Sequence, residues 1–466
     1  MELYIVVTTL PPNPKVPPRI LPPGPPEPPI VGQAVAYHWN PIPLMREAAR
    51  YGDLVTMSVK PWLVYLVNHP ELIQEVLVTN HQRVGRWRNV EAMKYLMGDG
   101  LVTSDDPIHL RQRRLMQPVF RQQLIESYAQ IMIAYAEERS RSWEDGSRVN
   151  MEREMRDLTL NIVAKTLFGI DLSDEVRRIG AALELSNAYM STRFNQYERM
   201  RALYHRLPLP LTVRFKHHLG YLNRVVEELI SQRKSTVDER FDLLAALLEI
   251  RDDETVSPNI EPMTEQQVRD EIVTMLAVGH ETVTVALTWT WYLLCTHPRV
   301  QTQLQAELDA VLAGRSPTLD DLPNLEFTEK VFREAMRLYP PIWRMGRVAI
   351  EPLELAGYEI PVGAMICLPT MIIHRDPRFF DNAAEFLPER WTPEFRDGLH
   401  RFAYFPFGGG PRLCIGEGFA WMEAKLILAT LAQRWMVQPD PQHQISYLPL
   451  ISLRPKNGMP MFLSQR

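Results

Sequence analysis

The sequence predicts a mainly helical protein in which a few strands form small β-sheets. Long segments with the helical spacing of apolar residues dominate the chain, whereas strand-like runs are confined to residues 54–67 and 347–367. Of the 466 residues, 45% are hydrophobic and 23% are charged, a composition typical of a globular protein that buries a large core. Such an excess of helix argues against a doubly wound parallel sheet.

The expected elements begin with an amphipathic helix over residues 40–51. Two strands follow at 54–59 and 62–67, where β-branched and aromatic residues are frequent. A second β-rich stretch covers 347–367, and the Pro361-Val362-Gly363 sequence separates short strands there. The other helices are expected at 70–79, 110–117, 126–143, 152–168, 176–194, 211–235, 240–251, 264–295, 299–312 and 326–338, with a last one after 416.

Proline sets the first thirty residues apart from the rest. Residues 11–29 are rich in proline, so residues 1–30 are expected to form an extended strap, with a disordered tail as the alternative. Residues 31–466 are then one domain. The apolar run 3–10 is too short to cross a bilayer, which needs about 20 apolar residues. It also lacks the basic region of a signal peptide. We therefore expect no transmembrane anchor.

Charge and cysteine content narrow the possible function classes. The formal net charge of -5 argues against a nucleic-acid-binding protein. The three cysteines, Cys295, Cys367 and Cys414, lie far apart in sequence and do not form a disulfide framework. A reducing, cytoplasmic location is therefore expected.

A glycine-rich segment presents Cys414 at a junction between a loop and a helix. Residues 407–416 read FGGGPRLCIG, and three glycines with a proline favour a tight loop. The helix dipole and the free N–H groups at this position favour a thiolate. Arg412 adds a positive charge that could hold a carboxylate. The alternative is a glycine turn that contains a buried structural cysteine.

This segment resembles the haem-binding loop of the cytochrome P-450 family, in its soluble bacterial type. The matching positions are Phe407, Gly410, Arg412, Cys414 and Gly416. The resemblance implies the cytochrome P-450 fold, with haem b held between a long distal helix and the cysteine loop. It also implies that Cys414 is the iron ligand, that Phe407 shields the sulfur and that Arg412 binds a propionate. Thiolate donation to iron favours O–O cleavage.

The expected helix at 264–295 carries polar residues inside an apolar run. Burying Glu281 and Thr282 in mid-helix costs free energy unless they are paired or useful. Gly279 weakens the helix by roughly 1 kcal/mol relative to alanine, and the Thr282 hydroxyl can bond back to a carbonyl one turn earlier. A helix face with a gap, an acid and an alcohol is suited to proton transfer. The alternative is a packing glycine beside an exposed glutamate.

The same segment resembles the oxygen-binding motif of the family's distal helix. The resemblance implies that Thr282 and Glu281 are catalytic residues, which stabilise and protonate the oxygen bound at the iron. Val278 stands where the family usually has Ala or Gly, so we expect a narrower groove near the iron. The pair also counts against family branches that rearrange a peroxide without reducing O2.

Glu334 and Arg337 share a helix face at i and i+3, a spacing that usually marks a solvated salt bridge of little value. The Leu-Tyr-Pro-Pro sequence that follows makes the segment similar to the family's Glu-x-x-Arg helix, and residues 386–391 resemble its partner segment. The resemblance implies that Glu334, Arg337 and Arg390 form a structural network that holds the cysteine loop. It also places Arg347 at a position that binds a propionate.

His109 and Arg113 lie at i and i+4, so both are expected on one helix face. They correspond to the propionate clamp of the family, which implies that they bind haem. A basic, solvated helix face is the alternative, because Arg111 and Arg114 lie alongside.

The resemblance implies a monooxygenase that inserts one atom of O2 into a small apolar organic substrate, by hydroxylation or epoxidation. No reductase-like extension follows in the sequence, so electrons are expected from a separate ferredoxin-type, flavodoxin-type or diflavin donor. Arg111, Arg114, Arg121 and Lys425 could attract an acidic donor. Two alternatives remain: an enzyme that rearranges a peroxide or dehydrates its substrate without reducing O2, and a haem protein that only binds a ligand.

By resemblance, Val278, Ile342 and Arg344 are expected near the substrate pocket. The surrounding segments are rich in Met, Trp, Leu and Val, which favours a fatty acid, a terpenoid or a steroid-like molecule. If Arg344 enters the pocket, it could hold a carboxylate, and a fatty acid would be favoured. The alternative is that Arg344 points to solvent or to a propionate.

Overall fold

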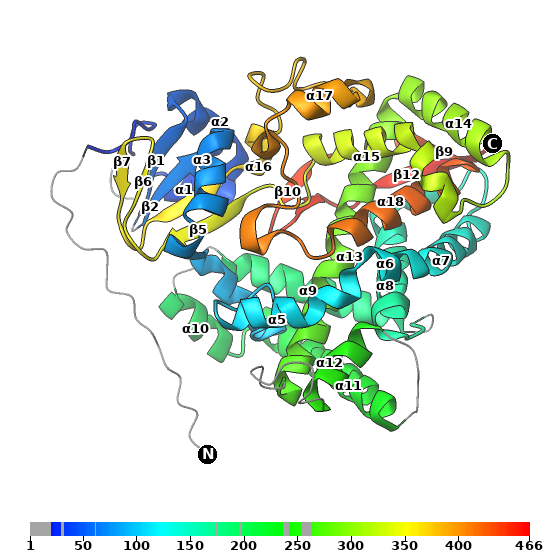
Figure 1. Cartoon of the computed structure of the whole chain (residues 1–466), viewed down its shortest axis with the longest axis horizontal. Helices are drawn as coiled ribbons and strands as arrows, with labels where there is room; N and C mark the ends of the chain where they lie inside the picture. Colours follow the sequence, from blue (N-terminus) through cyan, green and yellow to red (C-terminus); the bar gives the residue numbers. More distant parts are fainter. Residues whose placement is uncertain are drawn as a thin grey trace.

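The longest helix, α13 (Glu265–Thr296), passes through the middle of the molecule (Figure 1). It begins at a capping box, in which the Thr264 hydroxyl accepts a hydrogen bond from the Gln267 N–H and the Gln267 side chain accepts one from the Thr264 N–H. Within the described ranges it is the one helix long and apolar enough to cross a membrane, and 72% of that apolar stretch is buried inside the protein. This burial is typical of a core helix.

The computed structural model describes residues 20–28, 32–60, 62–172, 175–194, 198–235, 242–252 and 263–466. Most of the expected strap at 1–30 therefore lies outside the described residues. Two helices pack along the length of α13, namely α8 (Met151–Phe168) and α15 (Glu326–Leu338). The other helices are α1 (Ala34–Trp39), α2 (Pro41–Ala48), α3 (Pro70–Gln74), α4 (Lys94–Met97), α5 (Ile108–Met116), α6 (Gln122–Ser127), α7 (Ala129–Arg141), α9 (Val176–Phe194), α10 (Glu198–Arg206), α11 (Pro210–Ser235), α12 (Leu243–Asp252), α14 (Pro298–Leu312), α16 (Thr370–Ile373), α17 (Pro393–Gly398) and α18 (Glu417–Ala432).

Strands from the two expected β-rich regions join in one five-stranded sheet. The strand order is β1-β2-β8-β5-β3, and β2 pairs with β8 in parallel, with Tyr65 opposite Ile366. The other neighbours in this sheet are antiparallel. Its strands are β1 (Leu54–Val59), β2 (Trp62–Val67), β3 (Val84–Arg86), β5 (Met345–Ala349) and β8 (Met365–Leu368). Figure 1 shows this sheet with α1, α2 and α3 on one side of the molecule.

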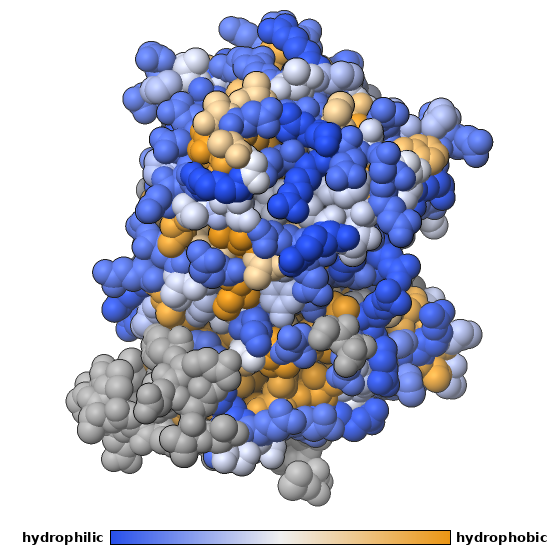
Figure 2. Space-filling model, turned by 90° about the vertical axis from the view of Figure 1, so that its right-hand side faces the viewer, coloured by the Kyte–Doolittle hydropathy of each residue, from blue (hydrophilic) through white to orange (hydrophobic). Residues whose placement is uncertain are grey.

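Three smaller sheets complete the described part of the fold. A three-stranded sheet has the order β4-β12-β9, and two hairpin-like pairs join β6 to β7 and β10 to β11. The strands are β4 (Arg148–Asn150), β6 (Leu353–Leu355), β7 (Tyr358–Ile360), β9 (Trp435–Pro439), β10 (Tyr447–Pro449), β11 (Leu453–Pro455) and β12 (Pro460–Gln465). The largest apolar core surrounds α13, and two further clusters lie beside the five-stranded sheet. Hydrophilic residues cover most of the face seen in Figure 2, with scattered apolar patches between them.

The predicted fold class is confirmed, and most expected elements are present within a few residues of their predicted ends. The expected helix at 40–51 is shorter, because α2 ends at Ala48 and a 3-10 turn, Ala49–Tyr51, follows it. The sequence did not predict α1, α10 or the β4-β12-β9 sheet. The strands of that sheet are three to six residues long, and β4 lies far from its partners in sequence, so their pairing leaves little local signal.

Candidate functional site

The glycine-rich segment before α18 folds as the predicted tight loop. The N–H of Cys414 donates to the carbonyl of Phe407 at 3.0 Å and closes the loop. Gly408 and Gly410 have φ values of +77° and +68°, and a Cβ on Gly410 would lie 1.9 Å from the carbonyl oxygen of Leu77. Gly410 is therefore required both by its backbone conformation and by the close approach of a neighbouring chain segment.

The thiol of Cys414 lies in an unusual environment. The side chain is exposed, yet burial by the surrounding protein raises the pKa of the thiol to about 11. Both hold because the sulfur is enclosed by protein without being packed against it. The N–H of Gly416 lowers the pKa, as expected from sequence, but burial outweighs it. The helix terminus therefore favours the thiolate in the predicted direction, and a cation bound at the sulfur would favour it further.

Three basic groups gather beside the cysteine loop from separate elements. They are Arg412 in the loop, Arg347 on β5 and the buried His109 on α5. Burial lowers the pKa of Arg347 to about 10, with a further contribution from the nearby charge of Arg412. Burial also lowers the pKa of His109, and Arg412 again contributes. Two guanidinium groups and an imidazole held together in this way fit an anionic group with two carboxylates, as the propionates of haem would supply.

Two aspartates lie at the edge of this basic cluster. The guanidinium of Arg412 is 3.8 Å from Asp105 and 3.9 Å from Asp106, and it donates to the carbonyl of Ser104 at 3.1 Å. Asp106 also lies 3.1 Å from Nδ1 of His109. These partners hold the side chains of Arg412 and His109 in defined positions.

The two residues of the expected clamp take different partners. His109 faces Asp106, whereas Nη1 of Arg113 donates to the carbonyl of Leu413 at 2.7 Å. Leu413 directly precedes Cys414, so Arg113 ties α5 to the cysteine loop. Both side chains lie next to the cysteine loop, and their joint binding of a propionate stays a prediction.

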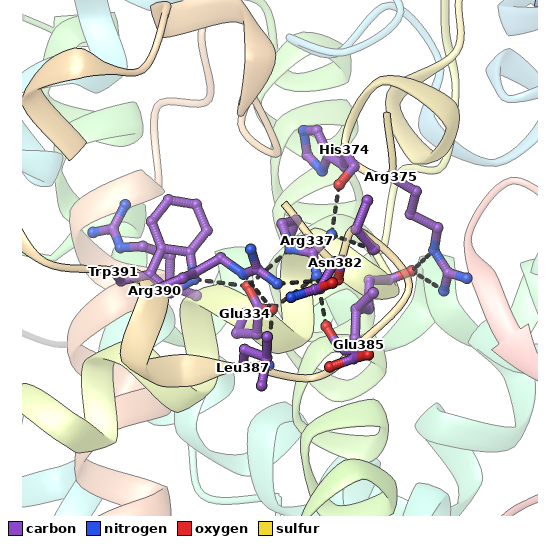
Figure 3. A network of polar contacts seen from close by, with 12 residues as sticks. Glu334, Arg337, His374, Arg375, Asn382, Glu385, Leu387, Arg390 and Trp391 are labelled. Atoms are coloured by element: carbon purple, nitrogen blue, oxygen red, sulfur yellow. Dashed lines mark hydrogen bonds and ion pairs between the residues drawn. The ribbon is translucent and has the colours of Figure 1, made fainter. Parts of the chain in front are cut away.

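Glu334, Arg337 and Arg390 form one buried network (Figure 3). Nε and Nη2 of Arg337 each donate to the Glu334 carboxylate at 2.8 Å, and Nε of Arg390 donates to it at 2.9 Å. The indole N–H of Trp391 and the backbone N–H of Leu387 also donate hydrogen bonds to the Glu334 carboxylate, at 2.8 and 3.0 Å. These two donors were not predicted, although both lie in the segment 386–391 that also contains Arg390.

Arg337 also binds the backbone of a long connecting segment. Its Nη1 donates to the carbonyls of His374 and Ala383 at 2.8 and 2.7 Å, and its Nη2 donates to the carbonyl of Glu385 at 2.9 Å. Arg337 and Glu334 have no exposed surface. The network therefore satisfies a buried ion pair and at the same time fixes the chain between α16 and α17.

On α13, the hydroxyl of Thr282 donates to the carbonyl of Val278 at 3.1 Å, which is the backward bond that the sequence predicted. Val278, Gly279 and Thr282 are all only partly buried, whereas most of α13 is fully buried. A Cβ on Gly279 would meet only the methyl groups of Val163, at 3.4 Å or more. Packing against α8 therefore does not require a glycine at this position.

Glu281 is paired, and only 15% of its side chain is exposed. Its Oε1 accepts hydrogen bonds from the Ser452 hydroxyl at 2.7 Å and from the Asn187 amide at 3.0 Å, and it lies 3.7 Å from Nε of Arg454. Arg454 is held more tightly by Glu152, at 2.7 Å. Glu281 thus faces a polar cluster built by α8, α9 and the segment around β11, and the alternative of an exposed glutamate is excluded.

Arg344 lies among aromatic rings. Its guanidinium carbon is 4.5 Å from the ring centre of Trp343, 4.8 Å from that of Tyr37 and 5.7 Å from that of Trp87. Ile342, two residues earlier, is partly buried. The side chain of Arg344 is therefore held by α1 and by the segment after β3, a position that the sequence could not show.

One of the four basic residues expected on the surface is buried. Lys425 is buried on α18, where its Nζ donates to the carbonyl of Leu322 at 2.7 Å and to Glu329 at 3.2 Å. It is not available to attract a partner.

The other two cysteines, Cys295 and Cys367, are buried, and burial raises the pKa of each thiol to about 12.

Comparison with known proteins agrees with this geometry. Residues 22–462 match the family model described as Cytochrome P450. The chain is 37% identical to cyclooctatin synthase of Streptomyces melanosporofaciens, over 91% of this chain and 92% of that protein. It is 34% identical to pentalenene oxygenase of Streptomyces avermitilis, over 90% and 91%. The crystal structure of the cytochrome P450DA heme domain superposes with a TM-score of 0.84 at 27% identity, covering 96% of this chain and 98% of that chain.

Proposed function

Because the chain belongs to the cytochrome P450 family, we propose that it is a monooxygenase that inserts one oxygen atom of O2 into a neutral, apolar terpenoid. The observation that carries the proposal is the set of Streptomyces relatives. A cyclooctatin synthase, a pentalenene oxygenase and a cyclooctat-9-en-7-ol 5-monooxygenase each match about nine-tenths of the chain, at 37%, 34% and 32% identity. A terpenoid is the substrate class that these names share.

Haem is the cofactor of the family, and when bound it supplies the activation of O2. In our proposal, Cys414 is the axial ligand of the iron, and its enclosed but unpacked sulfur supports this role. Arg347, Arg412 and His109 hold the propionates. Phe407, whose ring packs 6.0 Å from that of Trp421, shields the sulfur from solvent.

In our proposal, Thr282 and Glu281 both take part in proton transfer, and their side chains lie on different sides of α13. Adjacent residues on a helix point about 100° apart, so the two side chains do not face each other. The Thr282 hydroxyl is held by the carbonyl of Val278 and offers its oxygen lone pairs on the partly buried face. Glu281 lies in the polar cluster with Ser452 and Arg454, and in our proposal its carboxylate carries a proton. Val278 limits the space beside Thr282.

The position of Arg344 supports a neutral substrate. A guanidinium held against three aromatic rings is already stabilised, and turning it toward a substrate carboxylate would give up those contacts. A fatty acid would therefore gain little from Arg344. This favours the terpenoid over the fatty acid among the substrate classes considered from sequence.

We propose that electrons come from a separate acidic protein that docks near α5. Arg113 places α5 directly against the cysteine loop, and Arg114 and Arg121 nearby are exposed. Exposed positive charge mainly raises the association rate with an acidic donor.

The substrate class can be tested by ligand binding to the haem-loaded protein. We expect a polycyclic terpene hydrocarbon to shift the haem spin state at lower concentration than a long-chain fatty acid. We also expect the acid and its methyl ester to bind with similar, weak affinity, because the guanidinium of Arg344 is held by its aromatic neighbours. Arg344→Gln should leave the ratio of acid to ester affinity unchanged. Preferential binding of the acid by the wild type, lost in this variant, would show that Arg344 anchors a carboxylate.

Thr282→Ala is expected to uncouple electron use from product formation. The variant should still consume reductant at a rate similar to the wild type, but hydrogen peroxide should rise at the expense of product, because the hydroxyl that positions a proton is lost. The matched control is Thr288→Ala, since the Thr288 hydroxyl makes the same backward bond on α13, to the carbonyl of Thr284 at 2.6 Å. Equal coupling in both variants would reduce Thr282 to a packing residue.

A further inference from the structure

His374 joins the buried network to the cysteine loop. It follows α16 and has no exposed surface. Its carbonyl accepts a hydrogen bond from Nη1 of Arg337 at 2.8 Å, as Figure 3 shows. On its other side, the ring nitrogen Nε2 accepts a hydrogen bond from the backbone N–H of Phe405 at 2.9 Å. One buried residue thus binds both the ion pair and the segment that leads into the loop.

From Phe405, backbone hydrogen bonds continue to the cysteine. The carbonyl of Phe405 accepts from the N–H of Gly408 at 3.0 Å, and the carbonyl of Phe407 accepts from the N–H of Cys414 at 3.0 Å. The bonds of Glu334 and Arg337 described above end on residues 374–391. His374 therefore extends the network by a side-chain bond to the backbone at the entrance of the loop.

The ring of His374 is fixed in one orientation and one tautomer. It stacks on Tyr404, with ring centres 5.1 Å apart, and meets the edge of Phe405 at 5.4 Å. Burial, together with the charge of Arg337, lowers the pKa of the imidazole to about 3, so the ring is neutral under ordinary conditions. A neutral imidazole has one acceptor nitrogen. Since Phe405 offers an N–H, that nitrogen is Nε2 and the proton resides on Nδ1.

We propose that His374 is a positioning residue for Cys414, which transmits the position of the Glu334–Arg337 pair to the cysteine loop through the N–H of Phe405. The proposal rests on the proposed function in one respect, namely that Cys414 is the ligand of the haem iron. The imidazole Nε2 of His374 is the buried acceptor for the N–H of Phe405. Without this acceptor the N–H has no partner in an apolar surrounding, and the entrance of the loop can shift.

Two variants separate the acceptor from the ring. His374→Phe keeps an aromatic ring to stack on Tyr404 but removes the acceptor, whereas His374→Gln supplies an amide oxygen near the position of Nε2. Hydrogen exchange of the Phe405 amide, measured by mass spectrometry on peptides covering 402–408 of the full haem-loaded chain, is the direct readout. We expect exchange to be about tenfold faster in His374→Phe than in the wild type, and restored in His374→Gln.

The reduced carbonyl complex provides the second readout, because its absorption distinguishes a thiolate ligand from a displaced or protonated one. The fraction with the thiolate-type band is expected to fall in His374→Phe and to recover in His374→Gln. Equal exchange and equal spectra in His374→Phe and wild type would overturn the proposal, as would failure of His374→Gln to restore either. If His374→Phe does not fold, the decision rests on the other two proteins: a slow Phe405 amide in both supports the proposal, and a fast one in either overturns it.

The role of Cys414 as iron ligand and the role of His374 as positioning residue can be disproved separately. If the wild type binds haem without a thiolate-type band, then Cys414 is not the ligand and the proposed function is wrong. Amide exchange of Phe405 does not depend on the iron ligand, so it still reports whether His374 holds the entrance of the loop. Slow exchange beside a normal thiolate-type spectrum in the wild type is the result expected if both inferences hold.

Discussion

Replacing Cys414 with His is expected to abolish the thiolate-type spectrum of the reduced carbonyl complex and to remove oxygen insertion entirely. Imidazole can bind iron, so some haem is retained, but it donates less electron density than a thiolate and does not favour O–O cleavage. The measurements are the carbonyl absorption spectrum and product formation with a surrogate reductase. Both should fall to background, because no other thiol can take over: Cys295 and Cys367 are buried elsewhere in the core.

A matched pair of variants controls for the loss of a thiol. Cys414→Ala and Cys295→Ala remove the same atoms, one from the cysteine loop and one from the buried end of α13. We expect Cys295→Ala to keep the thiolate-type band and to lose stability only. A normal carbonyl spectrum in Cys414→His or Cys414→Ala would mean that the axial ligand lies elsewhere.

Arg337→Ala is expected to prevent accumulation of soluble, haem-loaded protein. Removing one partner of a buried ion pair costs about 3–5 kcal/mol, and each buried carbonyl left without a donor adds about 1–3 kcal/mol. Arg337 serves Glu334 and three carbonyls, so the sum approaches the whole stability of a typical domain, about 5–15 kcal/mol. Soluble yield and haem absorbance per protein are the measurements.

The control for this variant is Arg315→Ala. Arg315 also binds a carboxylate in two places, that of Asp321, but its side chain is 52% exposed. An exposed pair of this kind contributes little to stability, so Arg315→Ala should fold and load haem normally. Arg337→Ala protein that is soluble and haem-loaded at the yield of Arg315→Ala would contradict the structural role of the network.

Features with a local cause were predictable from the sequence. The cysteine loop follows from glycines that tolerate left-handed φ, and the start of α13 follows from the capping residues Thr264 and Gln267. The backward bond of Thr282 is likewise a property of one helical turn. In each case the residues that determine the structure are neighbours in the sequence.

Features that depend on distant partners were not predictable. Lysine is usually a surface residue, but Glu329 on α15 pairs with Lys425 and so allows its burial. Arg344 was expected in the pocket, at solvent or at a propionate, and its aromatic neighbours come from α1 and from the segment after β3. The role of His374 as a hydrogen-bond acceptor could not be predicted from the sequence, because its donor, the N–H of Phe405, lies 31 residues away along the chain.

The burial of α13 on nearly all sides has a consequence for synthesis of the chain. On the ribosome, α8 is complete before α13 emerges, but α15, α18 and β9, which also cover it, are made later. Until then a 32-residue apolar helix lacks half of its neighbours and offers a surface on which nascent chains associate. Slow expression at low temperature, or abundant chaperones, should therefore raise the yield more than any change to the surface, and a chain that stops after α14 should precipitate.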